Sequence, residues 1–172
     1  MNQPIVLTLI APDRPGIVQR ISAVIAEHDG AWHQSSMSRL AGQFAGILLG
    51  DVPRDRAEAC LAALSALEEE GMQVIARLGD PELAIPEGAE YHLELVGNDR
   101  PGIMAEITGV LGSHGVNVQG LETLVEGASM AGGHLFRAYA SLRLPAGADA
   151  TQIEEALEAL ADDLMVDINF EP

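Results

Sequence analysis

Two identical five-residue segments are the part of this chain best suited to chemistry. Asp13-Arg14-Pro15-Gly16-Ile17 recurs 86 positions later as Asp99-Arg100-Pro101-Gly102-Ile103. In both, the proline suits the first turn of a helix, and the glycine lets a ligand approach the backbone. The N–H groups at a helix start can bind a carboxylate, and an aspartate that turns outward can bind an ammonium group. Each segment therefore indicates a site for a zwitterion such as a free amino acid.

The same residues also have a purely structural interpretation. An aspartate just before a helix can cap it by accepting hydrogen bonds from the first N–H groups. Asp13 and Asp99 would then be occupied by their own helices, and the segment would be present twice only because the gene was duplicated. Spacing alone does not decide between a cap and a ligand site.

The repeat extends well beyond this segment. Leu7 and Leu9 align with Leu93 and Leu95 at the same offset, while Phe44 and Pro53 align with their counterparts at an offset of 92. The second copy therefore carries extra residues, which we place in a longer hairpin tip at 127–133. We predict a first domain over residues 1–80, a linker over 81–90 that is rich in proline and glycine, and a second domain over 91–172.

Within each copy the apolar spacing changes between two and about 3.6 residues. This predicts the order β-α-β-β-α-β twice, with strands at 31–40, 44–52 and 73–78 in the first copy and 116–126, 135–144 and 165–170 in the second. The fold class is α+β, with two ferredoxin-like domains, each a four-stranded antiparallel sheet that carries two helices on one face. The other face of each sheet is left open.

The open faces are predicted to mix apolar side chains with arginines. They would carry Val6, Thr8 and Ile10 in the first copy and Leu135, Arg137, Tyr139, Ser141 and Arg143 in the second. Such faces, or the sheet edges, are expected to meet another domain.

Composition excludes several functions. The chain has nine arginines, no lysine and 26 acidic residues, for a net charge of −17. Without lysine it is not a Schiff-base enzyme or a P-loop hydrolase, and its charge disfavours nucleic acid and membrane surfaces. The single cysteine, Cys60, excludes an internal disulfide and is expected to pack in a helix. No metal, cofactor or leader segment is predicted, so a cytoplasmic location is expected.

The charge is shared unequally between the halves. Residues 1–86 contain six arginines and eleven acidic residues, whereas residues 87–172 contain three arginines and fifteen acidic residues. The net charges are −5 and −12. The second half would attract a basic protein partner more strongly.

The strand–Asp-Arg-Pro-Gly-Ile–helix pattern, followed by Gly115-Val116-Asn117-Val118, resembles the ACT domain, and the resemblance covers nearly the whole chain. With Ala31-Trp32, the segments 37–46 and 129–133, and Leu135–Ala138, the pattern is similar to the tandem ACT proteins of the glycine cleavage system transcriptional repressor family. The resemblance implies an amino-acid site in the second copy, made by Asn98, Asp99, Arg100, Pro101, Gly102, Ile103 and Asn117. The first-copy counterpart, Asp13, Arg14, Gly16 and Ile17, is expected to be weaker because Ala31 stands where the second copy has Asn117.

The resemblance also implies a function. The chain would be a non-enzymatic regulator that binds glycine or a similar small amino acid and contacts a LysR-type activator, without touching DNA, and it could form a homodimer. One alternative is a regulatory subunit of an amino-acid biosynthetic enzyme. A remote alternative is an acylphosphatase-like enzyme that uses Arg100 and Asn117.

Overall fold

The computed structural model describes residues 1–80, 87–127 and 133–172. The chain divides into two compact units, unit 1 (Met1–Ala84) and unit 2 (Ile85–Pro172). Most of the predicted linker, residues 81–86, and most of the predicted hairpin tip, residues 128–132, lie outside the described part. At the described end of the linker, the backbone oxygen of Gly88 accepts a hydrogen bond from Arg143, and β5 begins at Glu90.

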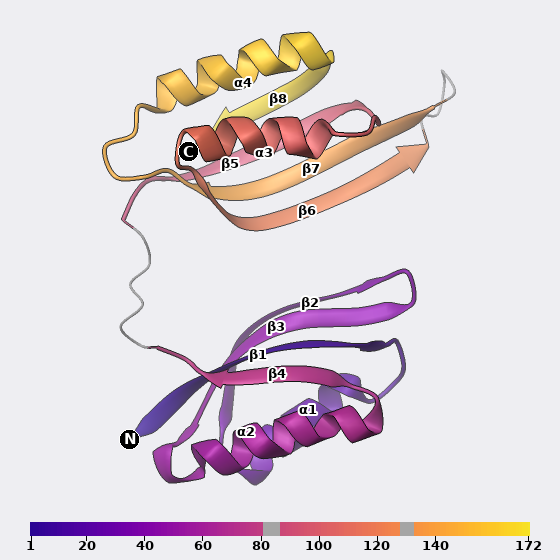
Figure 1. Cartoon of the computed structure of the whole chain (residues 1–172), viewed down its shortest axis with the longest axis vertical. Helices are drawn as coiled ribbons and strands as arrows, with labels where there is room; N and C mark the ends of the chain where they lie inside the picture. The colour runs from indigo at the N-terminus through magenta and orange to yellow at the C-terminus, as the bar shows by residue number, and fades with distance from the viewer. Residues whose placement is uncertain (81–86, 128–132) are drawn as a thin grey trace. The chain divides into compact units, whose positions relative to one another are not determined.

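Both units have the predicted element order (Figure 1). Unit 1 contains β1 (Asn2–Pro12), α1 (Ile17–Glu27), β2 (Ala31–Leu40), β3 (Gln43–Pro53), the 3-10 helix η1 (Arg54–Arg56), α2 (Ala57–Ser65), the 3-10 helix η2 (Ala66–Glu70) and β4 (Gln73–Leu78). Unit 2 contains β5 (Glu90–Asn98), α3 (Ile103–Ser113), β6 (Asn117–Gly127), β7 (His134–Arg143), α4 (Ala150–Leu164) and β8 (Val166–Glu171).

The sheets have the orders β2-β3-β1-β4 and β6-β7-β5-β8. Neighbouring strands pair antiparallel in both sheets. The two helices of each unit cover one face of its sheet, as Figure 1 shows. The predicted α+β, ferredoxin-like architecture is thus confirmed for both units. The first strand lies in the interior of each sheet because the third and fourth strands pair on either side of it.

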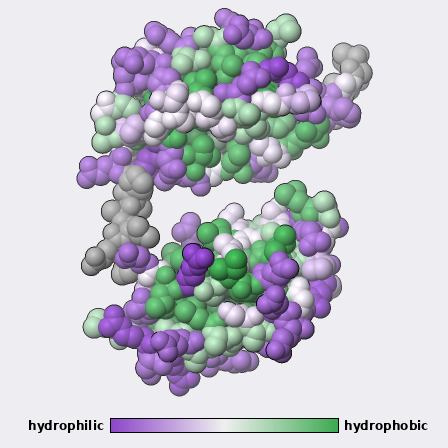
Figure 2. Space-filling model, in the orientation of Figure 1, coloured by the Kyte–Doolittle hydropathy of each residue, from purple (hydrophilic) through white to green (hydrophobic). Residues whose placement is uncertain are grey.

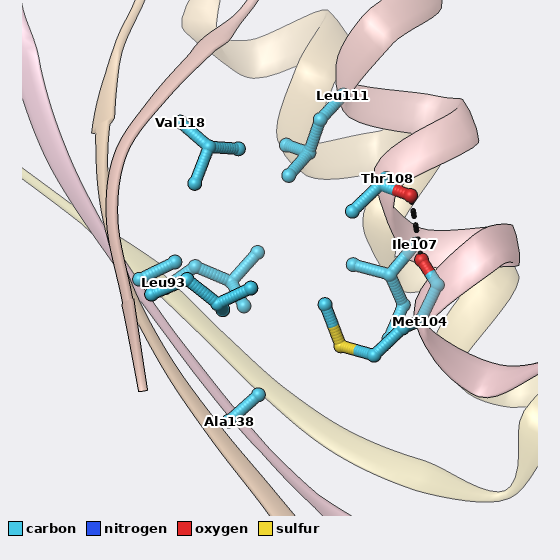
Figure 3. A pocket seen from close by; sticks show the side chains of 9 residues that line it. Leu93, Met104, Ile107, Thr108, Leu111, Val118 and Ala138 are labelled. Carbon is cyan, nitrogen blue, oxygen red and sulfur yellow. Dashed lines mark hydrogen bonds between the residues drawn. The ribbon is translucent and has the colours of Figure 1, made fainter. Parts of the chain in front are cut away.

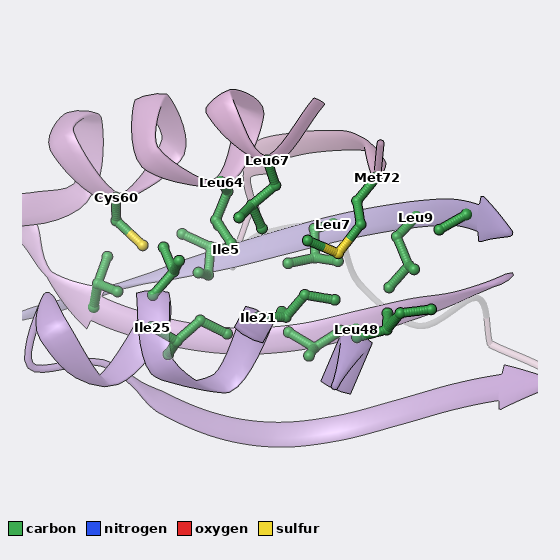
Figure 4. Packing of buried hydrophobic residues seen from close by; sticks show 14 of the residues in the cluster. Ile5, Leu7, Leu9, Ile21, Ile25, Leu48, Cys60, Leu64, Leu67 and Met72 are labelled. Atoms are coloured by element: carbon green, nitrogen blue, oxygen red, sulfur yellow. The ribbon is translucent and has the colours of Figure 1, made fainter. Parts of the chain in front are cut away.

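The helix-facing side of each sheet forms a core. In β1 the alternation of side chains buries Ile5, Leu7 and Leu9, and α1 packs Ile21 and Ile25 against them (Figure 4). Unit 2 has an equivalent cluster of its own, which includes Leu93, Leu95, Ile107 and Leu111. Burying a side chain of this size contributes about 1.5–3 kcal/mol to the free energy of folding. Each unit therefore has a hydrophobic core of its own.

The first helices end in the same way. His28 Nδ1 donates to Val24 O at 2.8 Å, and His114 Nδ1 donates to Val110 O at 2.9 Å. The next residue turns left-handed in both units, with a φ of 56° at Asp29 and 69° at Gly115. Both helices therefore end at a histidine that is followed by a left-handed residue.

Two other residues have structural roles, and that of Cys60 is the one expected from the sequence. Cys60 on α2 is fully buried, and burial raises the pKa of its thiol. The Trp32 side chain packs partly buried against the core of unit 1, and its Nε1 donates to Ser35 Oγ at 3.3 Å.

Candidate functional site

The repeated Asp-Arg-Pro-Gly-Ile segments form equivalent strand-to-helix loops. Gly16 and Gly102 precede the two helices with φ of 94° and 90°, a left-handed conformation that favours glycine. The backbone N–H of Asp13 donates to Gly42 O, and that of Asp99 donates to His134 O, both at 2.9 Å. Each loop is thereby tied to the neighbouring hairpin at the same end of the sheet.

Of the two interpretations, the one in which Asp13 and Asp99 cap the helices is not what the structure shows. The residue at the cap position is the glycine, three residues later, and no side chain caps α1 or α3. The first-turn N–H groups, which have no partner inside a helix, are therefore not occupied by a side-chain cap.

The two aspartates have different surroundings. Asp13 Oδ2 accepts from Arg39 Nε at 2.5 Å. The equivalent of Arg39 in unit 2 is Val125, because both residues pair with a phenylalanine of the next strand. Among the described residues, no side chain donates to the Asp99 carboxylate. Unit 2 therefore offers an unneutralised carboxylate beside an uncapped helix start, whereas unit 1 does not. Sequence reasoning missed Arg39, although aligning the second strands of the two copies would have revealed it.

The two loop arginines are also held differently. Arg14 reaches across to the backbone oxygen of Glu70 at the end of η2. Arg100 Nη2 donates to Glu106 Oε1 at 2.7 Å on its own helix, and its Nε is enclosed without a hydrogen-bond partner among the described residues. Arg100 is thus held against α3 by Glu106, a residue that sequence reasoning did not single out.

The remaining predicted residues serve the loop in different ways. Asn98 ends β5 and pairs with Leu135, so it lies at the same end of the sheet as the loop. Pro101 is exposed, whereas Ile17 and Ile103 are buried and anchor the helices to the core. The two isoleucine side chains are therefore closed to a ligand, and the backbone N–H of Ile103 already donates to Arg100 O at 3.5 Å.

Asn117 is not brought near the loop within unit 2. It begins β6 opposite Arg143, and Arg143 pairs with Glu90 at the start of β5. The loop follows Asn98 at the other end of that strand, which is nine residues long, so the two lie roughly 25 Å apart along the strand. The remote acylphosphatase alternative needs Arg100 and Asn117 around one phosphate. The structure places them at opposite ends of the sheet.

A small pocket lies between α3 and the sheet of unit 2. It is lined by apolar side chains such as Met104, Leu111 and Val118, and the hydroxyl of Thr108 is already bonded to Met104 O at 2.7 Å (Figure 3). We interpret it as a gap in packing, since it presents no unused polar group to a ligand.

Two further findings concern the described part of the chain. No group of three histidine, cysteine, aspartate or glutamate side chains there is placed to hold a metal ion. No described helix combines the length and apolar character needed to cross a membrane.

Comparison with known proteins agrees with the architecture. Two ACT domain family models match the chain, one over residues 3–76 and the other over residues 91–163. The chain therefore consists of two tandem ACT domains and belongs to the ACT-domain family. No curated protein sequence matches it.

Two solved structures are similar over nearly the whole chain. One is an unknown protein from Galdieria sulphuraria, with a TM-score of 0.87 and 29% identity, covering 99% of this chain and 98% of that one. The other is a candidate glycine cleavage system transcriptional repressor, with a TM-score of 0.70 and 17% identity, covering 99% and 97%. At 17% identity the second likeness establishes a shared fold.

Proposed function

We propose that this protein is a non-enzymatic, cytoplasmic regulator that senses a small amino acid through the loop at Asn98–Ile103 and passes the signal to a protein partner. Membership of the ACT family and the structural likeness to a candidate glycine cleavage system repressor support this function. Glycine or serine is the ligand we expect, in line with the structural likeness to a candidate glycine cleavage system repressor.

One observation carries the proposal. The start of α3 is uncapped and stands next to Asp99, whose carboxylate has no partner among the described side chains. The N–H groups of the helix start attract the ligand carboxylate, and Asp99 attracts the ammonium group. In unit 1 the corresponding carboxylate is neutralised by Arg39. We therefore assign sensing to unit 2.

The position of Asn117 adds a requirement. Because it lies at the far end of the same sheet, one ligand cannot touch both Asn117 and the Asp99 loop of a single unit. We propose that Asn117 reaches the ligand from a second copy of the chain. β6 is an edge strand, so its start is available to such a neighbour.

A thermal-stability screen tests amino-acid sensing. Glycine, serine and the other proteinogenic amino acids are each added at about 10 mM. Those that bind with millimolar affinity should raise the Tm of the protein. Asp99→Asn should abolish the shift while leaving the Tm of the unliganded protein within about 1 °C. Asp13→Asn is the matched control and should retain the shift. Gly102→Val should also abolish it, because valine does not tolerate a φ of 90°.

The outcomes separate the parts of the proposal. If no amino acid shifts Tm, the loop does not sense amino acids. If Asp99→Asn and Asp13→Asn behave alike, the assignment to unit 2 is wrong. If Asn117→Ala loses the shift but the unsubstituted protein sediments as a monomer with the amino acid bound, the role of a second copy is excluded.

The protein partner can be identified by affinity capture from native lysate, with and without the amino acid identified in the screen. We expect a LysR-type activator, recovered in an amino-acid-dependent manner. Recovery of a biosynthetic enzyme instead would replace this proposal with a regulatory-subunit function. Direct binding to DNA is not expected at a net charge of −17.

A further inference from the structure

The open sheet face of unit 1 combines an apolar surface with the positively charged side chain of Arg77. Its exposed side chains include Ile10, Ile47 and Ile75, which are 44%, 50% and 60% exposed. They lie on the face that the helices leave bare, because they are in register with Thr8 and Ala45 and alternate with the buried residues of the same strands. Figure 2 shows hydrophobic side chains at the surface of this unit.

A cavity of about 500 Å³ lies on this face. Its apolar lining comes from Pro4, Val6, Leu49 and Leu78, and its charged lining comes from Arg77 and Asp80. Small-molecule sites commonly measure about 300–1,000 Å³ and combine an apolar lining with a few polar groups. In size and composition this cavity fits that description.

Arg77 supplies the specificity. It lies on β4 directly beside Val6, which pairs with Leu49 on its other side. In the described part of the chain no hydrogen bond or ion pair is made by the Arg77 side chain, whereas Arg20, Arg39 and Arg56 each pair with a carboxylate. Asp80 differs, since it has interactions of its own. An unpaired guanidinium beside an apolar surface suits a ligand with a carboxylate at one end and a hydrocarbon body.

The same face of a second copy is a poorer occupant. Packing two such faces together would bury Arg77 against acidic side chains that already have interactions of their own, Asp80 among them, which is costly. The carboxylate of Asp51 on this face already accepts from His33 Nε2 at 2.8 Å and from Asn2 Nδ2 at 2.9 Å. Charge complementarity therefore favours an occupant that brings its own carboxylate.

We propose that the open face of unit 1 binds a small apolar carboxylate, whose hydrocarbon body lies on Val6 and Leu49 and whose carboxylate pairs with Arg77. The site is distinct from the Asp99 loop and would give the protein a second small-molecule input. Unit 2 cannot have an equivalent site, since Glu171 stands at the register position of Arg77 and Ser141 at that of Leu49.

The probe is 4-phenylbutyrate, with the neutral 4-phenylbutyramide as its isosteric control, titrated into the full-length chain by calorimetry. A ligand of this size should bind with Kd on the order of 1 mM. Arg77→Gln should weaken binding about tenfold, as should replacing the acid by the amide. Leu49→Ser should weaken it about fivefold, and Asp80→Asn should strengthen it by removing a repulsive charge.

Arg54→Gln is the matched control. Arg54 belongs to η1, does not line the cavity, and its substitution removes the same charge from the same unit. It should leave Kd unchanged within about twofold. NMR spectra of the methyl groups should show ligand-induced shifts at Val6, Leu49 and Leu78 and not at the loop before α3. This result distinguishes 4-phenylbutyrate binding from amino-acid binding at that loop.

Several outcomes would overturn the proposal. These are no saturable binding up to about 10 mM, equal affinity for acid and amide, or equal loss in Arg77→Gln and Arg54→Gln. A dimer that Ile47→Glu converts to a monomer would also overturn it, because a second copy would then cover the face. Loss of amino-acid sensing with retained 4-phenylbutyrate binding would contradict only the proposed function.

Discussion

The two sheets of this protein share a backbone plan and differ on their open faces. In unit 1 that face is apolar and carries Arg77, whose side chain has no hydrogen bond or ion pair within residues 1–80, 87–127 and 133–172. In unit 2 the arginines on this face are already paired, Arg137 with Glu126 and Arg143 with Glu90. The face of unit 2 also carries further acidic side chains, which include Glu94, Glu122, Asp167 and Glu171.

The difference shows which positions a duplicated fold must keep. Residues facing the helices are apolar in both units, because they form the cores on which stability depends. Residues on the open face need only preserve strand geometry, so one copy could become apolar and the other charged. We therefore expect the units to have similar interiors and distinct ligands or partners.

The largest expected effect tests the similarity of the interiors. Ile21 and Ile107 occupy equivalent positions on α1 and α3 and are 0% and 2% exposed. Ile21→Ala and Ile107→Ala should each cost about 3 kcal/mol, through lost apolar contact and a residual cavity. Denaturant unfolding of the single variants measures this. A difference above about 2 kcal/mol would show that the two cores are not equivalent.

The Cys60 thiol should report on unit 1 alone. Burial raises its pKa, so less of it is thiolate at any given pH below that value, and modification should be slow until the unit opens. Ile21→Ala should speed modification about 100-fold, which corresponds to the expected loss of stability, and Ile107→Ala should leave the rate unchanged. Iodoacetamide labelling followed by mass spectrometry distinguishes the two. Equal acceleration would show that the units open together.

A smaller effect separates the open faces. The Arg143 side chain is 15% exposed, donates to Gly88 O at 3.0 Å and pairs with Glu90, whereas Arg77 has no such contact among the described residues. Arg143→Ala should therefore destabilise the protein by about 1–2 kcal/mol, and Arg77→Ala by less than about 0.5 kcal/mol. Thermal unfolding of both variants makes the comparison, and equal losses would contradict the distinction.

The smallest effect concerns the two loops. Arg39→Val gives unit 1 the residue that unit 2 has at this position and removes the neutralising partner of Asp13. Because the pair is largely exposed, stability should fall by less than about 1 kcal/mol. The variant should also gain a second, weaker amino-acid response, detected as a larger ligand-induced rise in Tm. If the response is unchanged, neutralisation of Asp13 is not what distinguishes the loops.

Much of this architecture was predictable from sequence. The spacing of Ile5, Leu7 and Leu9, and that of Ile17, Ile21 and Val24, predicted a strand and a helix because side-chain direction repeats every two and every 3.6 residues. The role of Asp13 stayed open in the sequence, since a local capping rule does not register a left-handed glycine three residues later.

The sequence by itself determined the duplication, the element order, the buried faces and the unequal charge, because these depend on residue type and near-neighbour spacing. Only the tertiary structure decided which distant residues meet. It paired Asp13 with Arg39, placed Asn117 at the far end of the sheet from Asp99, and set Arg77 beside an apolar surface. Those relations arise from strand order and register, which bring together residues far apart in the chain and separate residues that a motif places side by side.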